Sequence, residues 1–328
     1  MKNNLSATCD LCQKESTKRI CPHCHFELSH DAGMIDDHII AIIGGRETGK
    51  GHYIATLVHR LENEVGQEFN FSLRMLGDDT RERFERDYRT PLFAKKTLIA
   101  GTVSATVDST VKMPMVFRLT FQEGNRTRAI NLSFFDSAGE DMQNLDIMSS
   151  EARYIGYASG IVFLLDPLQI DSVREKLPIE ALPPKLPLAE PTYIVERLRE
   201  LFERQHQVSA TVKVSTPVAF VLSKVDALFP ILDPSSELRH TGEHFGSFNL
   251  ADAQSVHAEI WSYLQAWKGG LPGRVDSGFR NYQYFGTSSL GRPPDKKGNI
   301  ETVSPIRVED PFLWILYKLN LVKGRKGR

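Results

Sequence analysis

The sequence lacks a long hydrophobic run and has almost no excess charge of either sign. No stretch reaches the roughly 18 consecutive apolar residues that a membrane-spanning helix needs. The first residues, MKNNLSATCD, are polar and lack the apolar core of a secretory signal. A formal net charge of −1 leaves no basic footprint for nucleic acid. We therefore expect a cytoplasmic protein that has protein partners, no transmembrane segment and no direct nucleic-acid contact.

Cysteine is absent after residue 24, and the four cysteines before it form two CxxC pairs. These are Cys9, Cys12, Cys21 and Cys24. In a reducing compartment, two close CxxC pairs indicate metal binding rather than disulfides. Four thiolates can close a tetrahedral zinc site, which lets a small segment fold despite its small core. The sequence predicts a structural zinc ribbon over residues 1–30 that docks proteins. The alternative is four thiols in a disordered tail.

Apolar strand patterns alternate with helical patterns from residue 37 onward. Strands are expected at 38–43, 115–121, 129–135, 161–165, 218–222 and 282–285, and helices at 53–65, 192–204, 251–267 and 311–322. This alternation predicts an α/β domain with a mostly parallel sheet and helices on both faces. We expect the domain to span residues 37–323, with insertions near 66–112, 168–191 and 230–249. A basic tail, 324–328, follows.

A glycine-rich loop follows the first predicted strand of this domain and opens a helix. Its residues are Gly44, Gly45, Arg46, Glu47, Thr48, Gly49 and Lys50, and the helix continues with Gly51 and His52. In a P-loop of this form, backbone N–H groups and the helix N-terminus bind phosphate, and the lysine bridges the β- and γ-phosphates. The alternative is a glycine-rich turn at a strand end.

The loop lacks one of the side chains that ordinarily bind magnesium. The residue after the P-loop lysine is ordinarily Ser or Thr, whose hydroxyl binds Mg²⁺, but Gly51 has no side-chain ligand. Water would have to take that coordination position. Asp136 and Gly139, as DxxG at a strand end, fit the residues that sense magnesium and γ-phosphate. Thr102 and Thr106 are both candidates for the switch threonine.

Two later loops, both at strand ends, fit the recognition of a guanine base. In SKVD, Asp226 can accept hydrogen bonds from guanine N1–H and the 2-amino group, and Lys224 can pack along the base. Ser223 replaces the usual Asn or Thr. In GTSS, Ser288 and Ser289 lie where a backbone N–H would meet the 6-oxo group. The alternative for SKVD is a surface tetrapeptide without a ligand.

Glu140, Arg46 and Lys50 are the candidate catalytic residues. Glu140 occupies the position at which Ras-like enzymes orient the attacking water; alternatively, it caps a helix or binds a partner. Arg46 could stabilise the departing phosphate as an arginine finger supplied in cis. It could equally face solvent or pair with Glu47.

Through GGRETGK, DSAGED, SKVD and the final DPFLWIL, residues 37–323 resemble the translation-factor-related and Ras-like P-loop GTPases, and more closely the bacterial double-GTPase families. The resemblance implies GTP or GDP and Mg²⁺ as ligands. It also implies a slow or partner-activated GTPase, acting as a switch in a multi-component bacterial system of conflict or signalling. A second GTPase or an effector would be its partner.

Two other functions stay open. Gly51 and Glu140 suggest a catalytically impaired GTP- and GDP-binding protein that serves as an assembly or docking module. A P-loop ATPase or kinase is disfavoured by Asp226, because adenine offers that carboxylate no matching donors. The sequence leaves the oligomeric state undetermined.

Overall fold

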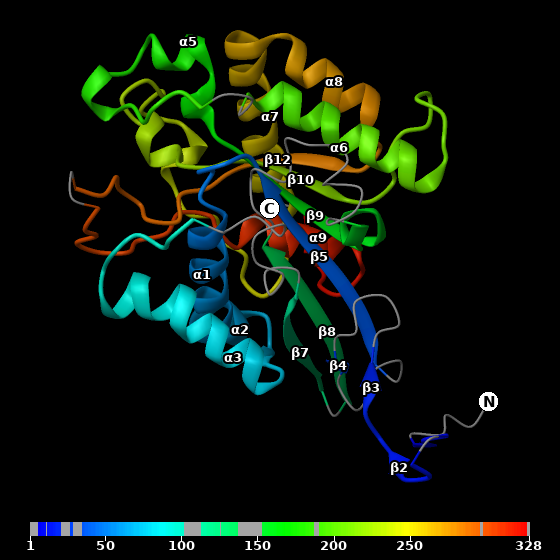
Figure 1. The fold of residues 1–328 in the computed structure, drawn as a ribbon. Coiled ribbons are helices and arrows are strands. Elements are labelled where there is room, and N and C mark those ends of the chain that lie inside the picture. Colours follow the sequence, from blue (N-terminus) through cyan, green and yellow to red (C-terminus); the bar gives the residue numbers. More distant parts are fainter. Residues whose placement is uncertain are drawn as a thin grey trace.

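The computed structural model describes residues 6–10, 12–20, 27–28, 35–101, 113–124, 126–136, 153–186, 190–295 and 298–326. Its centre is a seven-stranded sheet in the order β12-β10-β9-β5-β8-β7-β6 (Figure 1). The strands are β5 (Asp36–Gly44), β6 (Phe71–Met75), β7 (Met115–Glu123), β8 (Arg126–Asp136), β9 (Gly160–Leu165), β10 (Val218–Leu222) and β12 (Tyr282–Gly286).

The sheet is mostly parallel, which confirms the predicted fold class. β5 pairs in parallel with β8 and β9, and β10 pairs in parallel with β9 and β12. Every residue of β9 and β10 is buried, and an unbroken apolar run is what a parallel strand covered on both faces requires. The exception is β7, which pairs antiparallel with both β6 and β8. A tight turn at Gly124, with a φ of 61°, joins β7 directly to β8.

Helices cover both faces of the sheet and enclose two apolar cores (Figure 1). On one face lie α1 (Lys50–Arg60), its π-helical continuation η1 (Leu61–Val65), α2 (Gly66–Glu68), α3 (Asp78–Phe84), the π-helical η2 (Glu85–Ala94) and α9 (Asp310–Lys318). The other face carries η5 (Arg153–Tyr157), α5 (Asp171–Arg174), α6 (Pro191–His206), α7 (Leu250–Lys268) and α8 (Gly270–Gly278). Among the described residues, no helix is both long enough and apolar enough to cross a membrane.

The predicted insertions contain regular structure of their own. The 66–112 stretch supplies β6 to the main sheet, along with α3 and η2. The 168–191 stretch contains α5, with the 3₁₀ helices η6 (Pro167–Gln169) and η7 (Ile179–Ala181) on either side of it. The 230–249 stretch contains the 3₁₀ helix η9 (Glu237–Arg239) and β11 (Phe248–Asn249), and a further 3₁₀ helix, η8 (Val225–Leu228), lies just before it. β11 pairs in parallel with β13 (Gly324–Arg325), so the basic tail begins inside the fold.

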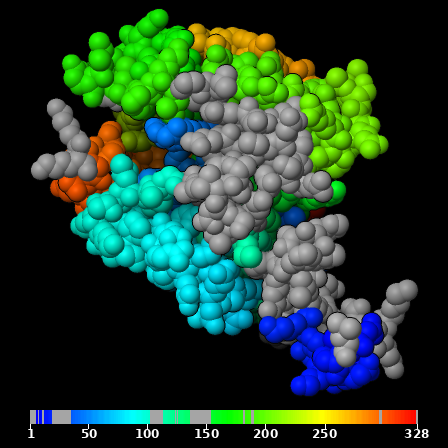
Figure 2. All heavy atoms as spheres, in the orientation of Figure 1, coloured from blue at the N-terminus to red at the C-terminus, as the bar shows by residue number. Residues whose placement is uncertain are grey.

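The N-terminal region, which precedes β5, forms two small hairpins. β1 (Ala7–Thr8) pairs with β2 (Glu15–Ser16), and β3 (Arg19–Ile20) pairs with β4 (Glu27–Leu28), both antiparallel. In Figure 2 the blue atoms of this region project from the lower right of the molecule. Each CxxC pair of the sequence falls between the two strands of one hairpin.

Candidate nucleotide-binding site

The loop between β5 and α1 turns sharply at the carboxyl end of a buried strand. A Cβ on Gly44 would lie 2.7 Å from the carbonyl oxygen of Leu164, so only glycine fits beside the neighbouring strand. Gly49 has a φ of 89°, a left-handed conformation that glycine adopts without a side-chain clash. The turn brings the N–H groups of a helix N-terminus to the edge of the sheet, an arrangement that binds phosphate.

The Lys50 side chain folds back over this loop. Its Nζ atom donates to the carbonyl oxygens of Gly44 and Gly45, each at 3.0 Å. Thr48 Oγ1 donates to the Gly45 carbonyl at 2.9 Å and tightens the same turn. An ammonium group can exchange carbonyl oxygens for phosphate oxygens, which are stronger acceptors. The geometry suits the predicted phosphate-binding role of Lys50, which stays a prediction.

Arg46 and Glu47 form the exposed tip of the loop. Their side chains are 56% and 51% exposed, and Arg46 Nε lies 3.9 Å from Glu47 Oε1. This is the arrangement in which Arg46 pairs with its neighbour. Exposed pairs of this length contribute little stability, so Arg46 can leave Glu47 at small cost when phosphate binds. Its role as an arginine finger stays a prediction.

The carboxyl end of β8 lies one strand away from the phosphate loop. In the parallel pairing of β5 with β8, Ile42 is opposite Asp136. The backbone of Asp136 therefore lies next to the strand that carries the loop, where the magnesium-sensing Asp of a DxxG motif belongs. The other predicted residues of this region lie outside the described residues: Gly139, Glu140, Thr102 and Thr106.

The loops after β10 and β12 are hydrogen-bonded to each other at the same edge of the sheet. Val225 N donates to the Thr287 carbonyl at 3.1 Å, and Thr287 N donates to the Leu222 carbonyl at 2.8 Å. β10 and β12 are parallel, with Leu222 opposite Gly286. The SKVD and GTSS segments thus form one unit at the carboxyl ends of the strands, where α/β sheets bind ligands.

Asp226 and Ser288 meet in this unit. The Ser288 side chain is hydrogen-bonded to the Asp226 carboxylate, and its Oγ accepts the N–H of Gly291 at 2.8 Å. Burial raises the pKa of Asp226, whereas the Ser288 hydrogen bond and the charge of Lys224 act to lower it. A partly buried carboxylate fixed in this way can accept paired donors from a purine base. Ser289, the next residue, is partly buried.

Lys224 is held by an acid that the sequence reasoning missed. Lys224 Nζ lies 2.8 Å from Asp166 Oδ2, and Asp166 is only 1% exposed. The other carboxylate oxygen accepts the N–H of Leu168 at 3.0 Å. Lys224 itself has a φ of 55°, in the left-handed region. A carboxylate directly after the buried run 161–165 was the available signal, because acids are rarely buried without a cation.

His52 and Ile99 meet at the start of α1. Ile99 N donates to His52 Nε2 at 3.1 Å. Burial and the nearby charge of Lys224 lower the pKa of His52 to about 4, so the ring is neutral at physiological pH and can accept this hydrogen bond. The base loop and the phosphate loop both follow the carboxyl ends of parallel strands, so they lie at the same edge of the sheet.

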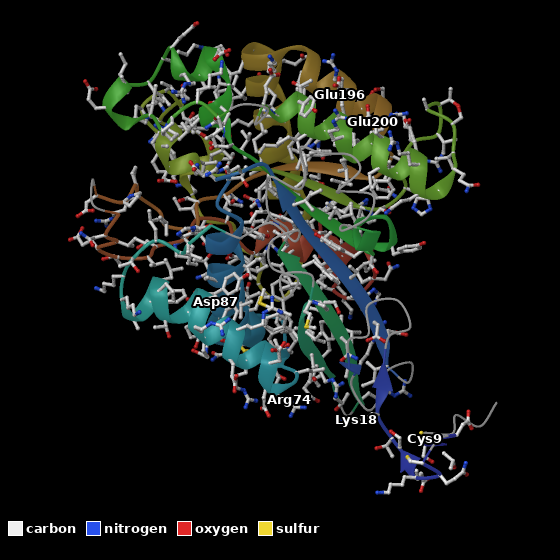
Figure 3. The ribbon with its side chains drawn as sticks, in the orientation of Figure 1. Cys9, Lys18, Arg74, Asp87, Glu196 and Glu200 are labelled. Carbon is white, nitrogen blue, oxygen red and sulfur yellow. The ribbon has the colours of Figure 1, made fainter. Side chains whose placement is uncertain are left out.

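The cysteine-rich region is described only in part. Cys9 and Cys12 lie in the turn between β1 and β2, where the Cys9 carbonyl accepts the N–H of Gln13 at 2.8 Å. Figure 3 shows Cys9 at the far end of this N-terminal region, away from the main sheet. Cys21 and Cys24 lie outside the described residues. Within the part of the chain that the structure describes, no three His, Cys, Asp or Glu residues gather as metal ligands.

The sequence matches the model of a protein family described as Double-GTPase 2. The match covers residues 38–263, more than half of the 328 residues. It begins in β5, includes the phosphate loop, DSAGE and SKVD, and ends within α7.

The chain is also similar to a protein of Mycolicibacterium smegmatis that is named "Putative ESX-1 scaffolding and assembly protein SaeC". The two sequences are 28% identical over 319 residues, which is 90% of this chain and 78% of that protein.

Proposed function

Because this chain belongs to the Double-GTPase 2 family, we propose that it binds GTP and GDP and hydrolyses GTP slowly until a protein partner completes the site. In this proposal the phosphate loop and Lys50 bind the diphosphate, and Asp226 selects guanine. The partner is a second GTPase or an effector in a multi-component bacterial system, and the chain acts as a molecular switch.

One observation supports this proposal: the groups for phosphate and for base lie at the same edge of the sheet. The phosphate loop follows β5 and the base loops follow β10 and β12. These strands belong to one parallel set, in which Gly44 is opposite Leu164, and Leu222 is opposite both Leu165 and Gly286. The SKVD and GTSS segments are hydrogen-bonded to each other at this edge. A nucleotide must contact the phosphate-binding groups and the base-binding groups together, because its base and its phosphates are covalently linked.

Calorimetry with GDP, GTP and ATP tests the proposal directly. GDP and GTP should bind, and ATP should bind at least about 100-fold more weakly, because adenine leaves the carboxylate unpaired. Lys50→Ala should weaken both guanine nucleotides by about 10-fold or more, since it removes a charge-assisted contact to phosphate. A preference for ATP, or no nucleotide binding by the intact chain, would contradict the proposed function.

A second candidate function is a nucleotide-dependent assembly module with little turnover. Two observations favour it: Gly51 lacks the side-chain hydroxyl that the P-loop pattern places there, and the relative from Mycolicibacterium smegmatis is named as a scaffolding and assembly protein. Turnover assays separate the two functions. Phosphate release that rises on adding a protein partner supports the switch, and release that stays at background supports the module.

Asp166→Asn should weaken the binding of GDP and of ADP by the same factor, about 5- to 30-fold. The reason is that Asp166 holds the Lys224 side chain, which packs along the base plane and does not discriminate between bases. Calorimetry of the variant with both nucleotides measures this. The matched control is Asp171→Asn, which removes an exposed lysine-paired carboxylate five residues further on. Equal losses in both variants would show that Asp166 does not position Lys224.

We also propose that the four cysteines bind one structural zinc ion. The support is the placement of both CxxC pairs between the strands of two small hairpins, as expected for thiolate turns. In this proposal the ribbon docks a protein partner. Metal analysis of the purified chain should find one zinc per molecule, and its absence would remove the proposal.

A further inference from the structure

Apolar atoms crowd the position at which a P-loop hydroxyl would bind magnesium. A Cβ built on Gly51 would lie 3.1 Å from Ile99 Cγ2 and 3.7 Å from Tyr88 Cε1. Mg²⁺ demands oxygen ligands in near-octahedral geometry and gives up its water reluctantly. A methyl group and an aromatic ring cannot act as oxygen ligands, and neither can hydrogen-bond to a water that replaces the hydroxyl. The residues described at this position therefore do not fit a magnesium ion.

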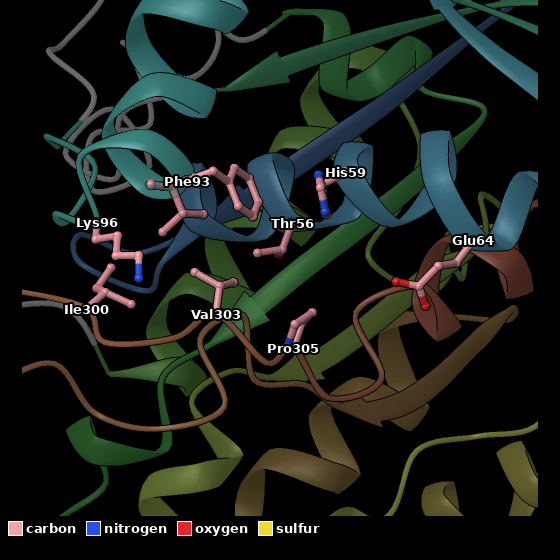
Figure 4. A pocket seen from close by; sticks show the side chains of 9 residues that line it. Thr56, His59, Glu64, Phe93, Lys96, Ile300, Val303 and Pro305 are labelled. Atoms are coloured by element: carbon pink, nitrogen blue, oxygen red, sulfur yellow. The ribbon is translucent and has the colours of Figure 1, made fainter.

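Ile99 is bonded to α1, and the stretch just before it is bonded to residues 300 and 301. Its N–H donates to His52 Nε2 at 3.1 Å, which ties it to α1. The Lys96 carbonyl accepts the N–H of Ile300 at 2.8 Å, and Lys96 Nζ donates to the Glu301 carbonyl at 3.1 Å. Figure 4 shows Lys96 beside Ile300 on the wall of a cavity of about 260 Å³ between α1 and the C-terminal segment. The contact with Gly51 is thus part of the fold.

The segment that backs Ile99 is also anchored to the base loop. Ser288 N donates to the Ile306 carbonyl at 3.0 Å, and Ile306 N donates to the Ser288 carbonyl at 2.8 Å. Residues 299–306 therefore connect the serine that bonds Asp226 with the stretch that positions Ile99.

From this packing we propose that the chain holds its guanine nucleotide without a magnesium ion, and that Ile99 occupies space that the ion and its ligands would need. The inference rests on the proposed function, since it concerns GDP in the same pocket. Lys50, the loop N–H groups and the positive end of the α1 dipole meet the charge of the diphosphate. All of them belong to the chain, so binding requires no divalent cation.

The test is calorimetry of the full chain with GDP, in excess Mg²⁺ and again in excess EDTA. We expect the two dissociation constants to agree within about threefold. A loss of more than about 10-fold in EDTA would overturn this inference and leave the proposed function intact. Failure of GDP to bind in either buffer would overturn both. EDTA would also remove the zinc that is proposed for the N-terminal ribbon. Thermal melting in both buffers is therefore the control, and it should show that the nucleotide domain is folded in each.

Two variants then test Ile99 as the cause. Gly51→Ser combined with Ile99→Ala supplies a hydroxyl and makes room for it, so GDP should bind at least about 10-fold more tightly in Mg²⁺ than in EDTA. Gly51→Ser alone should gain no such dependence, because its side chain meets Ile99. Leu98→Ala, at a neighbouring residue that is 42% exposed, is the control for Ile99→Ala. Full magnesium dependence in Gly51→Ser alone, or none in the double variant, would overturn the role of Ile99.

Discussion

Asp226→Ala should abolish the preference for guanine, lowering GDP affinity by about 100-fold or more while ADP affinity changes little. The carboxylate is the acceptor for two donors that only guanine carries, and each hydrogen bond to a charged group contributes about 1.5–3 kcal/mol. Its removal leaves guanine N1–H and the 2-amino group without a partner. Calorimetry with GDP and ADP, on the variant and on the wild type, gives the selectivity ratio directly.

The control for this variant is Asp233→Ala. Asp233 is an exposed residue in the loop that follows η8, and its carboxylate accepts hydrogen bonds from the N–H and the hydroxyl of Ser235. Its removal should leave both affinities unchanged. If Asp226→Ala and Asp233→Ala had the same small effect, Asp226 would not contact the base, and the guanine assignment would be wrong.

The pH dependence of GDP binding is a second test of whether the Asp226 carboxylate binds the base. Burial raises the pKa of Asp226, and only the ionised form accepts both guanine donors. GDP affinity should therefore be full at neutral pH and fall as the pH drops through the raised pKa. The fall should begin at a higher pH than an ordinary aspartate would give. Asp226→Ala should remove that part of the pH profile.

Arg307→Ala should lower the free energy of unfolding by about 3–5 kcal/mol. Arg307 is 2% exposed. Its Nη1 lies 2.7 Å from Asp252 Oδ2 and 2.8 Å from Asp310 Oδ2, and its Nη2 lies 2.9 Å from Asp252 Oδ1. Truncation would leave Asp310 buried with only His244, at 2.9 Å, to offset its charge. Urea denaturation followed by circular dichroism measures the loss.

Arg292→Ala is the matched control for Arg307. It removes an arginine–glutamate pair of similar length, 2.7 Å to Glu301, but the two side chains are 54% and 79% exposed. Water screens such a pair, so the expected loss is under about 1 kcal/mol. Similar losses for the two variants would mean that the buried network around Arg307 does not hold the fold together.

This network explains the DPFLWIL segment near the C-terminus. Asp310 is bonded to Arg307 and His244, and the apolar residues after it are buried in α9 against the sheet. The segment therefore joins the 230–249 stretch, α7 and α9 through charge and apolar packing. The segment lies outside residues 38–263, the range that the family model matches.

Six of the seven strands of the main sheet, and the loops that follow them, could be predicted from the sequence, but β6 and the order of the strands could not. Runs such as Gly160–Leu165 and Val218–Leu222 are apolar throughout, and only a strand covered on both faces needs that pattern. The glycine pattern of the phosphate loop likewise reflects a local backbone requirement, since Gly44 lies against Leu164 and Gly49 has a positive φ. Motifs and hydrophobic periodicity depend on residues that are close together in the sequence, so they can be recognised without knowing the tertiary structure.

Contacts between distant residues could be decided only by the tertiary structure. Asp166 and Lys224 are 58 residues apart, and Ile99 and His52 are 47 apart. A single sequence contains no record of which side chains meet after folding. The packing of Ile99 on Gly51, the buried acid behind Lys224 and the charges around Arg307 all arise where separate loops converge. The sequence alone thus determined which chemical groups are available, and the sheet determined which of them act together.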